Sequence, residues 1–574
     1  MDIVDIIVLL GLLAAISFFG LFTALRGAKQ TSAAQILHGS NVSVVTSALS
    51  VCSGFLSAVS LLGFPAEIYY QGTMLFWYGP MYMIAFPIVA YYFLPVFYNM
   101  KLTSIYEYLE IRFNFACRFL ASFTFCIQTW LYVSVALYAP ALALSTVISI
   151  PLSVSIFITA VLAALYVTLG GAKASIYTSA LQMALILANM VLIFSISLYH
   201  FGFNNILETA VAGGRLQLFD FRIDPRIRHS VWSLIIGGTG NILCLFAANQ
   251  LTVQRYMAMS SLRSAQWVIL LNVPFNFLIL TTYIGAGLIL YHKYFDCNPV
   301  LQSKDQASIL FPYFVVDELS TISGMVGLFT ASVYSAGVST ASASYSALAA
   351  VFIEDVIKQF QMKVQKHEPM ELKTSILLAR YLPLLFCCLS MVIAYLCSIM
   401  DTMVLQVSFS IFGIAGGPVL SVFCLGMFFP KIKGLAAFTA QLASTVFCVF
   451  IAAGALLNHV RPVGLPINET CEENNVTLEF VQKPEYGLVF PLQSNSWLIQ
   501  LFRISYQYYS ICALLVAFIV AHIVQCFSGY NEHFSVEAKL LSPLFQSTRK
   551  RKEIILDYAS GIRKDGEIPL GTIK

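Results

Sequence analysis

A run of side-chain hydroxyls between residues 332 and 346 is the densest group of potential ion ligands in the sequence. It contains Ser332, Ser335, Ser339, Thr340, Ser342, Ser344 and Ser346. On a helix, positions 335, 339, 342 and 346 share one face, and Thr340 lies beside Ser339. Na⁺ is a hard cation that binds neutral oxygens, so hydroxyls and free backbone carbonyls together can form its cage. The alternative, which we expect for most of these serines, is bonding to their own helix or to a neighbouring helix.

Free carbonyls inside an apolar segment require an interrupted helix. The segment 53–65 mixes three serines and two glycines with a proline, and the run Gly237-Gly238-Thr239-Gly240-Asn241 is also weak as a helix. We expect a break at each, because freed backbone groups are tolerated where they face protein or a water-filled cavity. Their separation by five spans predicts two inverted five-helix repeats, each led by a discontinuous helix. The alternative is that the glycines only allow close helix packing.

The composition shows which elements must position these residues. The chain has 574 residues, of which 59% are hydrophobic and 10% are charged, and its mean hydropathy is +0.80. Soluble domains carry about 25% charged residues, so this chain lacks the charge to cover soluble cores. Its 45 Phe and 29 Tyr exclude a disordered chain. The sequence therefore predicts an all-α, polytopic membrane protein.

Thirteen segments are long and apolar enough to span a bilayer. They lie near 3–26, 42–69, 74–98, 119–146, 152–170, 176–200, 231–254, 265–291, 321–353, 374–398, 403–428, 433–457 and 503–527. This divides the chain into four parts. The parts are a first helix and loop (1–39), a transport core (40–430), two last helices with a polar loop (431–529), and a tail (530–574).

The loop charges predict the orientation. Lys and Arg collect in alternate short loops and at 549–552, whereas the loops near 70, 148 and 400 have none. The positive-inside rule then places the C-terminal tail in the cytoplasm and the N-terminus outside. The sequons at Asn468 and Asn475 fall outside, where glycosylation occurs. Cys297 and Cys471 also fall outside, which allows a disulfide between them.

Signatures of catalysis are missing from the sequence. There is no HExxH, GxSxG or Walker A motif, no paired CxxC metal spacing, and the histidines are scattered. The net charge of +4 reflects loop charges and predicts no nucleic-acid binding. We therefore expect neither an enzyme nor a cofactor.

Several motifs resemble those of a known family. They are Tyr106-Glu-Tyr-Leu-Glu-Ile-Arg-Phe113, Tyr138-Ala-Pro-Ala141, Gly213-Gly-Arg-Leu216, Asn249-Gln250 with Val253-Gln-Arg-Tyr256, and Tyr334-Ser-Ala-Gly-Val-Ser-Thr-Ala-Ser342 with Glu354-Asp355. Between about residues 40 and 530 the chain is similar to the sodium:solute symporter family, in the branch of monocarboxylate, multivitamin and iodide transporters. This resemblance implies a leucine-transporter-type inverted-repeat core with thirteen spans and Na⁺ as the coupling ion.

The resemblance also implies site residues. The most widely shared sodium site corresponds to the hydroxyls of Ser339 and Thr340 with the carbonyls of Ser53, Leu56 and Ala336. A second sodium and the substrate are implied nearby. The matching positions are Ser57, Tyr132, Gln182 and Gln250, with Phe55, Ser60, Ser408 and Phe409 toward the substrate.

Three positions depart from the family pattern. Relatives commonly have an aspartate where this chain has Ser179, which affects the expected sodium affinity or stoichiometry. At the substrate position of span two, iodide carriers have Gln and monocarboxylate carriers have Thr, whereas this chain has Ser60. Ile242 lies near the tryptophan of the iodide branch, so iodide is the weaker candidate.

The expected function is sodium-coupled import of a small organic anion across the plasma membrane by alternating access. The spans show no obvious carboxylate for a cation and no obvious buried arginine for an anion. Bound Na⁺ and the positive end of a broken helix then supply the positive charge. Alternatives are a sodium-linked carrier of iodide, a sugar or a polyol, a channel, or a non-transporting sensor. Expected partners are Na⁺, the solute and the lipid bilayer; a homo-oligomer stays open.

Overall fold

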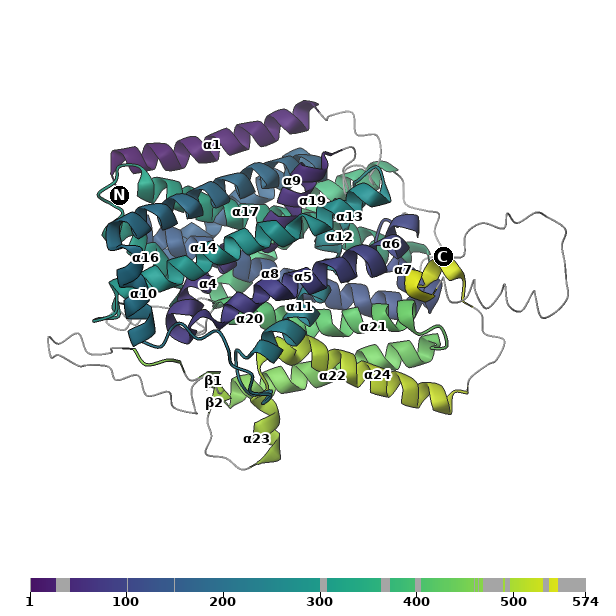
Figure 1. The fold of residues 1–574 in the computed structure, drawn as a ribbon. Coiled ribbons are helices and arrows are strands. Elements are labelled where there is room, and N and C mark those ends of the chain that lie inside the picture. The colour runs from purple at the N-terminus through teal and green to yellow at the C-terminus, as the bar shows by residue number, and fades with distance from the viewer. Residues whose placement is uncertain are drawn as a thin grey trace, which may run out of the picture.

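Long helices lying roughly side by side form the body of the protein (Figure 1). The computed structural model describes residues 2–26, 42–100, 102–148, 150–299, 307–362, 372–397, 404–458, 460–462, 464–467, 489–490, 496–529 and 536–545. Within these ranges the only strands are β1 (Arg461–Pro462) and β2 (Val489–Phe490), which pair antiparallel. The prediction of an all-α membrane protein is confirmed.

The α-helices follow the apolar segments of the sequence. They are α1 (Ile3–Arg26), α3 (Val44–Phe55), α4 (Ala58–Gln71), α5 (Tyr78–Ile88), α6 (Leu94–Met100), α7 (Glu107–Arg112), α8 (Phe115–Ile148), α9 (Leu152–Phe201), α10 (Phe203–Ala212), α11 (Gly238–Phe246), α12 (Gln250–Met257), α13 (Leu262–Leu270), α14 (Asn272–Lys293), α16 (Leu310–Glu318), α17 (Met325–Val351), α18 (Lys358–Phe360), α19 (Leu372–Cys397), α20 (Val404–Ile411), α21 (Gly417–Phe428), α22 (Gly434–Leu457), α23 (Trp497–Phe502) and α24 (Tyr509–Phe527).

Short 3₁₀ and π turns extend or join these helices. The 3₁₀ turns are η1 (Thr73–Trp77), η4 (Ala307–Ile309), η8 (Tyr506–Tyr508) and η9 (Ala538–Leu540). The π turns are η2 (Val89–Phe93), η3 (Ser233–Gly237), η5 (Phe352–Ile357) and η7 (Phe412–Gly416).

Ten helical segments of the described chain are long and apolar enough to cross a bilayer, and two bent pairs raise that number to 12. The bent pairs are α3 with α4 and η3–α11 with α12, each bent by 61°. The predicted span 152–170 falls within α9, whose apolar stretch Leu152–Ala164 is shorter than a full span. The total of thirteen spans stays a prediction.

The contacts of α9 show that its two halves run in opposite directions. A straight helix of 50 residues would be ~75 Å long, far more than a bilayer requires. Thr159 of α9 contacts Tyr334 of α17, and Ser175 contacts Ser342, which lies further along α17. Ser179 then contacts Ser339, which lies back toward Tyr334. The chain therefore advances along α17 and then returns, as expected for the separate segments 152–170 and 176–200.

Two sets of connections define two faces of the bundle. We call the face that holds residues 202–232 and 496–508 the outer face, and the face that holds 102–114 and 536–545 the inner face. On the outer face, Ser505 N–H donates to the Pro225 carbonyl at 2.9 Å. On the inner face, part of the predicted tail docks, since Ser542 Oγ donates to the Tyr92 carbonyl at 3.1 Å. These names follow the predicted topology, which stays a prediction.

The predicted glycosylation and disulfide positions are only partly described. Asn468, Asn475 and Cys471 lie outside the described residues. Cys297 takes part in a disulfide, whereas eleven other cysteines of the described chain are free thiols.

Candidate functional site

The first break separates α3 from α4 at Leu56 and Ser57. Both residues leave the helical conformation, with φ −78° and ψ 81° at Leu56 and φ −85° and ψ 172° at Ser57. The Leu56 N–H still bonds to the Cys52 carbonyl, so the carbonyls that follow Cys52 have lost their helical partners. Within the described ranges no donor bonds to the carbonyls of Ser53 or Leu56. The predicted break thus supplies free carbonyl oxygens.

The Ser339 hydroxyl on α17 connects three helices beside this break. Its Oγ lies 2.6 Å from Ser53 Oγ on α3 and donates to Ser179 Oγ on α9 at 2.9 Å. All three side chains are buried. Thr340 Oγ1 is also buried and has no hydrogen-bond partner among the described residues. The group therefore offers neutral oxygens alone, as a sodium site requires.

Other hydroxyls of α17 take the alternative role. Ser332 Oγ donates to the Leu328 carbonyl at 2.9 Å, and Ser342 Oγ donates to the Ser339 carbonyl at 3.0 Å. These serines satisfy their hydroxyls on their own helix. Ser342 Oγ also lies 3.3 Å from Ser175 Oγ on α9, so α17 contacts α9 through hydroxyls beyond the break as well.

A small cavity of about 20 Å³ begins where α4 starts. Its lining consists of Ser57, Val59, Ser60, Tyr132, Leu405, Ser408, Phe409 and Phe412. Five of these residues were predicted as site residues, and the cavity brings them together from α4, α8 and α20. Val59, Leu405 and Phe412 also line the cavity and were not predicted from the sequence. Phe412 was detectable, since it follows Phe409 by one helical turn.

Polar groups in the cavity lie at its α4 and α20 walls. Tyr132 lines the cavity together with Ser57, and its ring centroid lies 4.6 Å from that of Phe412. Ser408 Oγ is buried without a hydrogen-bond partner in the described chain. The cavity lies at the N-terminus of α4, a helix of 14 residues, where the helix dipole favours negative charge.

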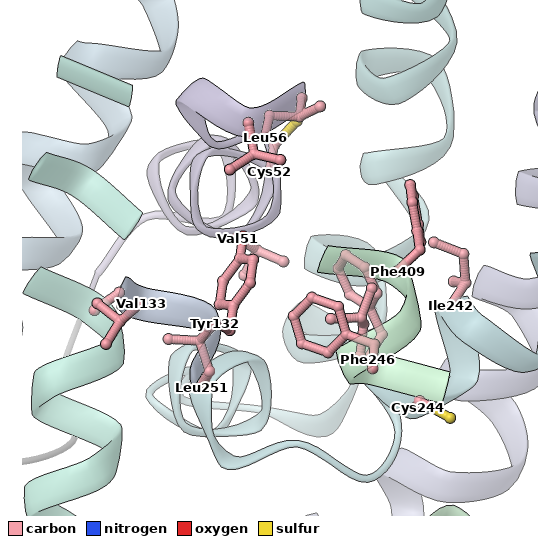
Figure 2. Close-up of a cluster of buried hydrophobic side chains, with 14 of the residues drawn as sticks. Val51, Cys52, Leu56, Tyr132, Val133, Ile242, Cys244, Phe246, Leu251 and Phe409 are labelled. Carbon is pink, nitrogen blue, oxygen red and sulfur yellow. The ribbon is translucent and has the colours of Figure 1, made fainter. Parts of the chain in front are cut away.

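Aromatic rings cover the cavity toward the outer face. The Phe409 ring centroid lies 6.4 Å from Phe64, 6.1 Å from Tyr78 and 6.3 Å from Tyr506. Figure 2 shows Phe409 and Tyr132 among the buried hydrophobic side chains of this region, with Leu56 from the first break. The cavity is closed in this conformation, because ligand pockets usually need about 300 Å³ or more.

The second break lies later than predicted. The glycine run 237–241 is helical, and the chain leaves the helix at Ala247, Ala248 and Asn249. A Cβ at Gly237 would lie 2.5 Å from the Gln507 carbonyl oxygen, and one at Gly240 would lie 2.5 Å from Ser510 Oγ. The glycines therefore serve close packing, which was the alternative reading, and the predicted break at this run is wrong.

Side-chain hydroxyls satisfy the carbonyls of the second break. Thr252 Oγ1 donates to the Leu245 carbonyl, Tyr256 to the Phe246 carbonyl and Tyr106 to the Ala248 carbonyl. The two breaks thus differ in chemistry. The first leaves carbonyls available to an ion, and the second uses its carbonyls as structural acceptors.

The remaining predicted residues lie at different distances from this site. Ala336 is buried on α17 one turn before Thr340, and Gln182 is buried on α9 three residues after Ser179. Gln250 lies on the inner face, because its amide donates to the Thr103 carbonyl and accepts from the Ile105 N–H. The Phe55 side chain lies outside the described residues.

The structure contains buried charges that were not expected from the sequence. Arg228 and Glu67 form an ion pair whose side chains are 1% and 0% exposed. Arg255 on α12 is buried and donates to the Ser50 carbonyl on α3. The expectation that no arginine is buried near the core is therefore wrong. The sequence could have indicated that Arg255 is buried, because this residue follows directly after the span predicted at 231–254.

Two bent helix pairs inside a bundle of membrane-spanning helices are typical of a membrane transporter built on a discontinuous-helix core. The sequence profile of the sodium:solute symporter family matches residues 35–444. The chain belongs to this family.

Known proteins similar to the chain cover most of its length. Mouse sodium-coupled monocarboxylate transporter 2 is 33% identical, with 94% of this chain and 86% of the mouse protein aligned. Human sodium-coupled monocarboxylate transporter 1 is 32% identical, with 98% and 94% aligned. A putative sodium-dependent multivitamin transporter of Drosophila melanogaster is 33% identical, with 87% and 82% aligned.

A solved structure shares the fold. A Na⁺-coupled sialic acid symporter, in a substrate-bound outward-open state, superposes with a TM-score of 0.74 at 22% identity. The match covers 92% of this chain and 99% of the symporter.

Proposed function

We propose that the chain is a sodium-coupled symporter that imports a small organic anion, a monocarboxylate or a vitamin carboxylate, across the plasma membrane. The N-terminus then lies outside and the C-terminus in the cytoplasm. The observation that carries the proposal is the first break, where free carbonyls and the Ser339 hydroxyl adjoin the cavity. The family membership and the names of the relatives support the same substrate class.

Sodium binding at this break uses some groups that otherwise lack partners, namely the Thr340 hydroxyl and the carbonyls of Ser53 and Leu56. A buried hydroxyl without a hydrogen bond costs about 1–3 kcal/mol, and Thr340 carries one. Na⁺ held by Ser339, Thr340 and the carbonyls of Ser53, Leu56 and Ala336 would satisfy these oxygens. The C-terminal end of α3 contributes its negative dipole to the same ion.

The anion belongs at the opposite side of the break, where α4 begins. There Ser57, Ser60, Tyr132 and Ser408 provide hydroxyls that can donate to a carboxylate. Leu56 of the ion cage and Ser57 of the cavity are consecutive residues, so the two charges bind close together. Unit charges ~7 Å apart attract by ~2.4 kcal/mol at an effective dielectric constant of 20. Sodium therefore strengthens anion binding by about 50-fold in this estimate.

The sodium gradient then drives uptake. A tenfold gradient supplies ~1.4 kcal/mol per ion, and the membrane potential adds ~2.3 kcal/mol per charge per 100 mV. Two sodium ions supply more free energy than the import of one anion against the membrane potential requires. Movement of the helix bundle around the fixed cavity would open it to each face in turn.

One observation favours a second candidate. Ser179 leaves the hydroxyl cluster without the carboxylate that relatives commonly have, which weakens attraction for a cation. A non-transporting sensor on the same fold would tolerate such a loss. Uptake measurements separate the two functions.

The test uses the purified full-length chain in proteoliposomes. Uptake of labelled lactate, nicotinate, biotin, iodide and mannitol is compared in an inward sodium gradient and in choline. We expect saturable, sodium-dependent uptake of at least one carboxylate, increased by an inside-negative potential. Equal uptake in sodium and choline contradicts the proposal, and sodium-stimulated mannitol uptake without carboxylate uptake contradicts the substrate class.

A further inference from the structure

An ion pair lies buried on the outer side of the cavity. Arg228 Nε lies 2.6 Å from Glu67 Oε1, and Nη2 lies 3.0 Å from Oε2, so the guanidinium holds the carboxylate with two parallel bonds. The third nitrogen, Nη1, donates to Gln406 Oε1 at 2.8 Å. Each of the three guanidinium nitrogens thus donates to an oxygen that another helix supplies.

The three partners of Arg228 belong to the elements that line or cover the cavity. Glu67 is on α4, seven residues, or ~10 Å, beyond Ser60. Gln406 precedes Ser408 by two residues on α20. The guanidinium carbon of Arg228 lies 4.9 Å from the ring centroid of Tyr506, and Tyr506 contacts Phe409. Arg228 therefore holds together the cover of the cavity.

One neighbouring titratable group does not change this charge balance. His229 Nε2 lies 3.6 Å from Glu67 Oε1 and 3.2 Å from the Tyr506 hydroxyl oxygen. Burial lowers the pKa of His229 to about 4, against the opposing effect of Glu67. The imidazole is neutral at pH 7, so the site contains one cation and one carboxylate.

We propose that Arg228 is an outer binding site for the carboxylate of the substrate, which replaces the Glu67 carboxylate when the cover opens. This inference rests on the proposed function, because it requires an anionic substrate. The cavity of about 20 Å³ has to widen before a substrate enters. Entry from the outer face requires the cover of the cavity to open, and the Arg228–Glu67 ion pair joins the parts of that cover. Separating a buried ion pair leaves two unpaired charges, which is strongly unfavourable.

A substrate carboxylate removes half of that cost. It presents the same two oxygens as Glu67, and the planar guanidinium binds either carboxylate with two bonds. Arg228 then stays paired throughout opening, and only Glu67 needs water as a replacement. A neutral sugar or a cation offers no such exchange. The pair therefore selects carboxylates before they reach the hydroxyls of the cavity.

The test measures KM for lactate and nicotinate in proteoliposomes that contain the full-length chain. Arg228→Gln removes the cation, Glu67→Gln removes the competing carboxylate, and the exchange E67R/R228E keeps an ion pair but reverses its direction. Arg226→Gln is the matched control, because Arg226 lies two residues away, is a third exposed and pairs with Asp224. Sodium-dependent uptake by the unmodified chain is required first, and its absence refutes the proposed function itself.

We expect Arg228→Gln to raise KM at least tenfold, Glu67→Gln to lower it about threefold or more, and the control to change it less than twofold. The exchanged pair should keep the high KM of Arg228→Gln. Recovery of the original KM in the exchanged pair would overturn the inference, since it would show a purely structural ion pair. An unchanged KM in Arg228→Gln would also overturn it. If Arg228→Gln does not reach the membrane, the KM of Glu67→Gln tests the inference instead. A raised KM in that variant would refute competition between Glu67 and the substrate carboxylate for Arg228.

Discussion

The hydroxyl oxygens of Ser53 and Ser339 lie 2.6 Å apart, although 286 residues separate them in the chain. Ser53 is in the last turn of α3, just before the first break, and Ser339 is in the middle of α17. Their contact places the hydroxyls of one repeat against the freed carbonyls of the other.

Ser339→Ala should weaken sodium activation of uptake. The substitution removes a ligand oxygen and the hydrogen bonds to Ser53 and Ser179, so we expect the sodium concentration for half-maximal uptake to rise at least tenfold, ~1.4 kcal/mol. Ser332→Ala is the control, because that hydroxyl bonds to its own helix. Both variants should reach the membrane in similar amounts. Unchanged sodium activation with reduced protein in the membrane would identify Ser339 as a packing residue.

Ser179→Asp should tighten sodium activation. The new carboxylate would adjoin the Ser339 hydroxyl and attract the ion. We therefore expect the sodium concentration for half-maximal uptake to fall at least threefold. Without sodium, the same buried charge is unpaired and destabilises the fold. The Tm of the purified variant should therefore rise more on sodium addition than that of the unmodified chain.

The neutral variant Ser179→Asn controls for the size of the aspartate side chain. It should show neither the tighter activation nor the larger sodium-dependent rise in Tm. If Asp and Asn behave alike at this position, the site works without the carboxylate common in relatives.

Tyr132→Phe should raise KM for the transported carboxylate about three- to tenfold. The variant loses one hydroxyl donor next to Ser57, worth about 0.5–1.5 kcal/mol, but keeps the ring contact with Phe412. Tyr283→Phe is the control, since the buried hydroxyl of Tyr283 has no partner within the described ranges. Uptake kinetics at saturating sodium separate the two variants. Equal KM values in both would place the substrate away from Tyr132.

Thr252→Val should destabilise the protein without changing sodium activation. Thr252 Oγ1 satisfies the Leu245 carbonyl at the second break, and an unsatisfied buried carbonyl costs about 1–3 kcal/mol. A lower Tm of the purified variant measures this effect. Thr281→Val, on an exposed position of α14, should leave the Tm nearly unchanged. A raised sodium requirement in Thr252→Val would show that the second break also holds an ion.

The sequence by itself determined the class of protein and the place of the first break. Apolar segments of sufficient length must become helices in a bilayer, because lipid offers no partners for the backbone. Serines and a glycine in such a segment predict an interruption, and the interruption lies at Leu56 and Ser57 as expected. Five of the eight residues that line the cavity also came from the sequence, through the resemblance of its motifs to a family.

Only the tertiary structure decided what each polar group does. The glycine-rich run 237–241 is weaker in a helix than the alanines at 247 and 248. The run nevertheless stays helical where it packs against Gln507 and Ser510, and the chain leaves the helix at the alanines. Ser332 and Ser339 are alike in sequence, yet one bonds to its own helix and the other reaches two neighbours. Arg228 and Glu67 are 161 residues apart, so their pairing depends on how α4 meets the outer segment. Local sequence sets whether a helix bends, but the partner of a buried polar group is set by which distant helix packs against it.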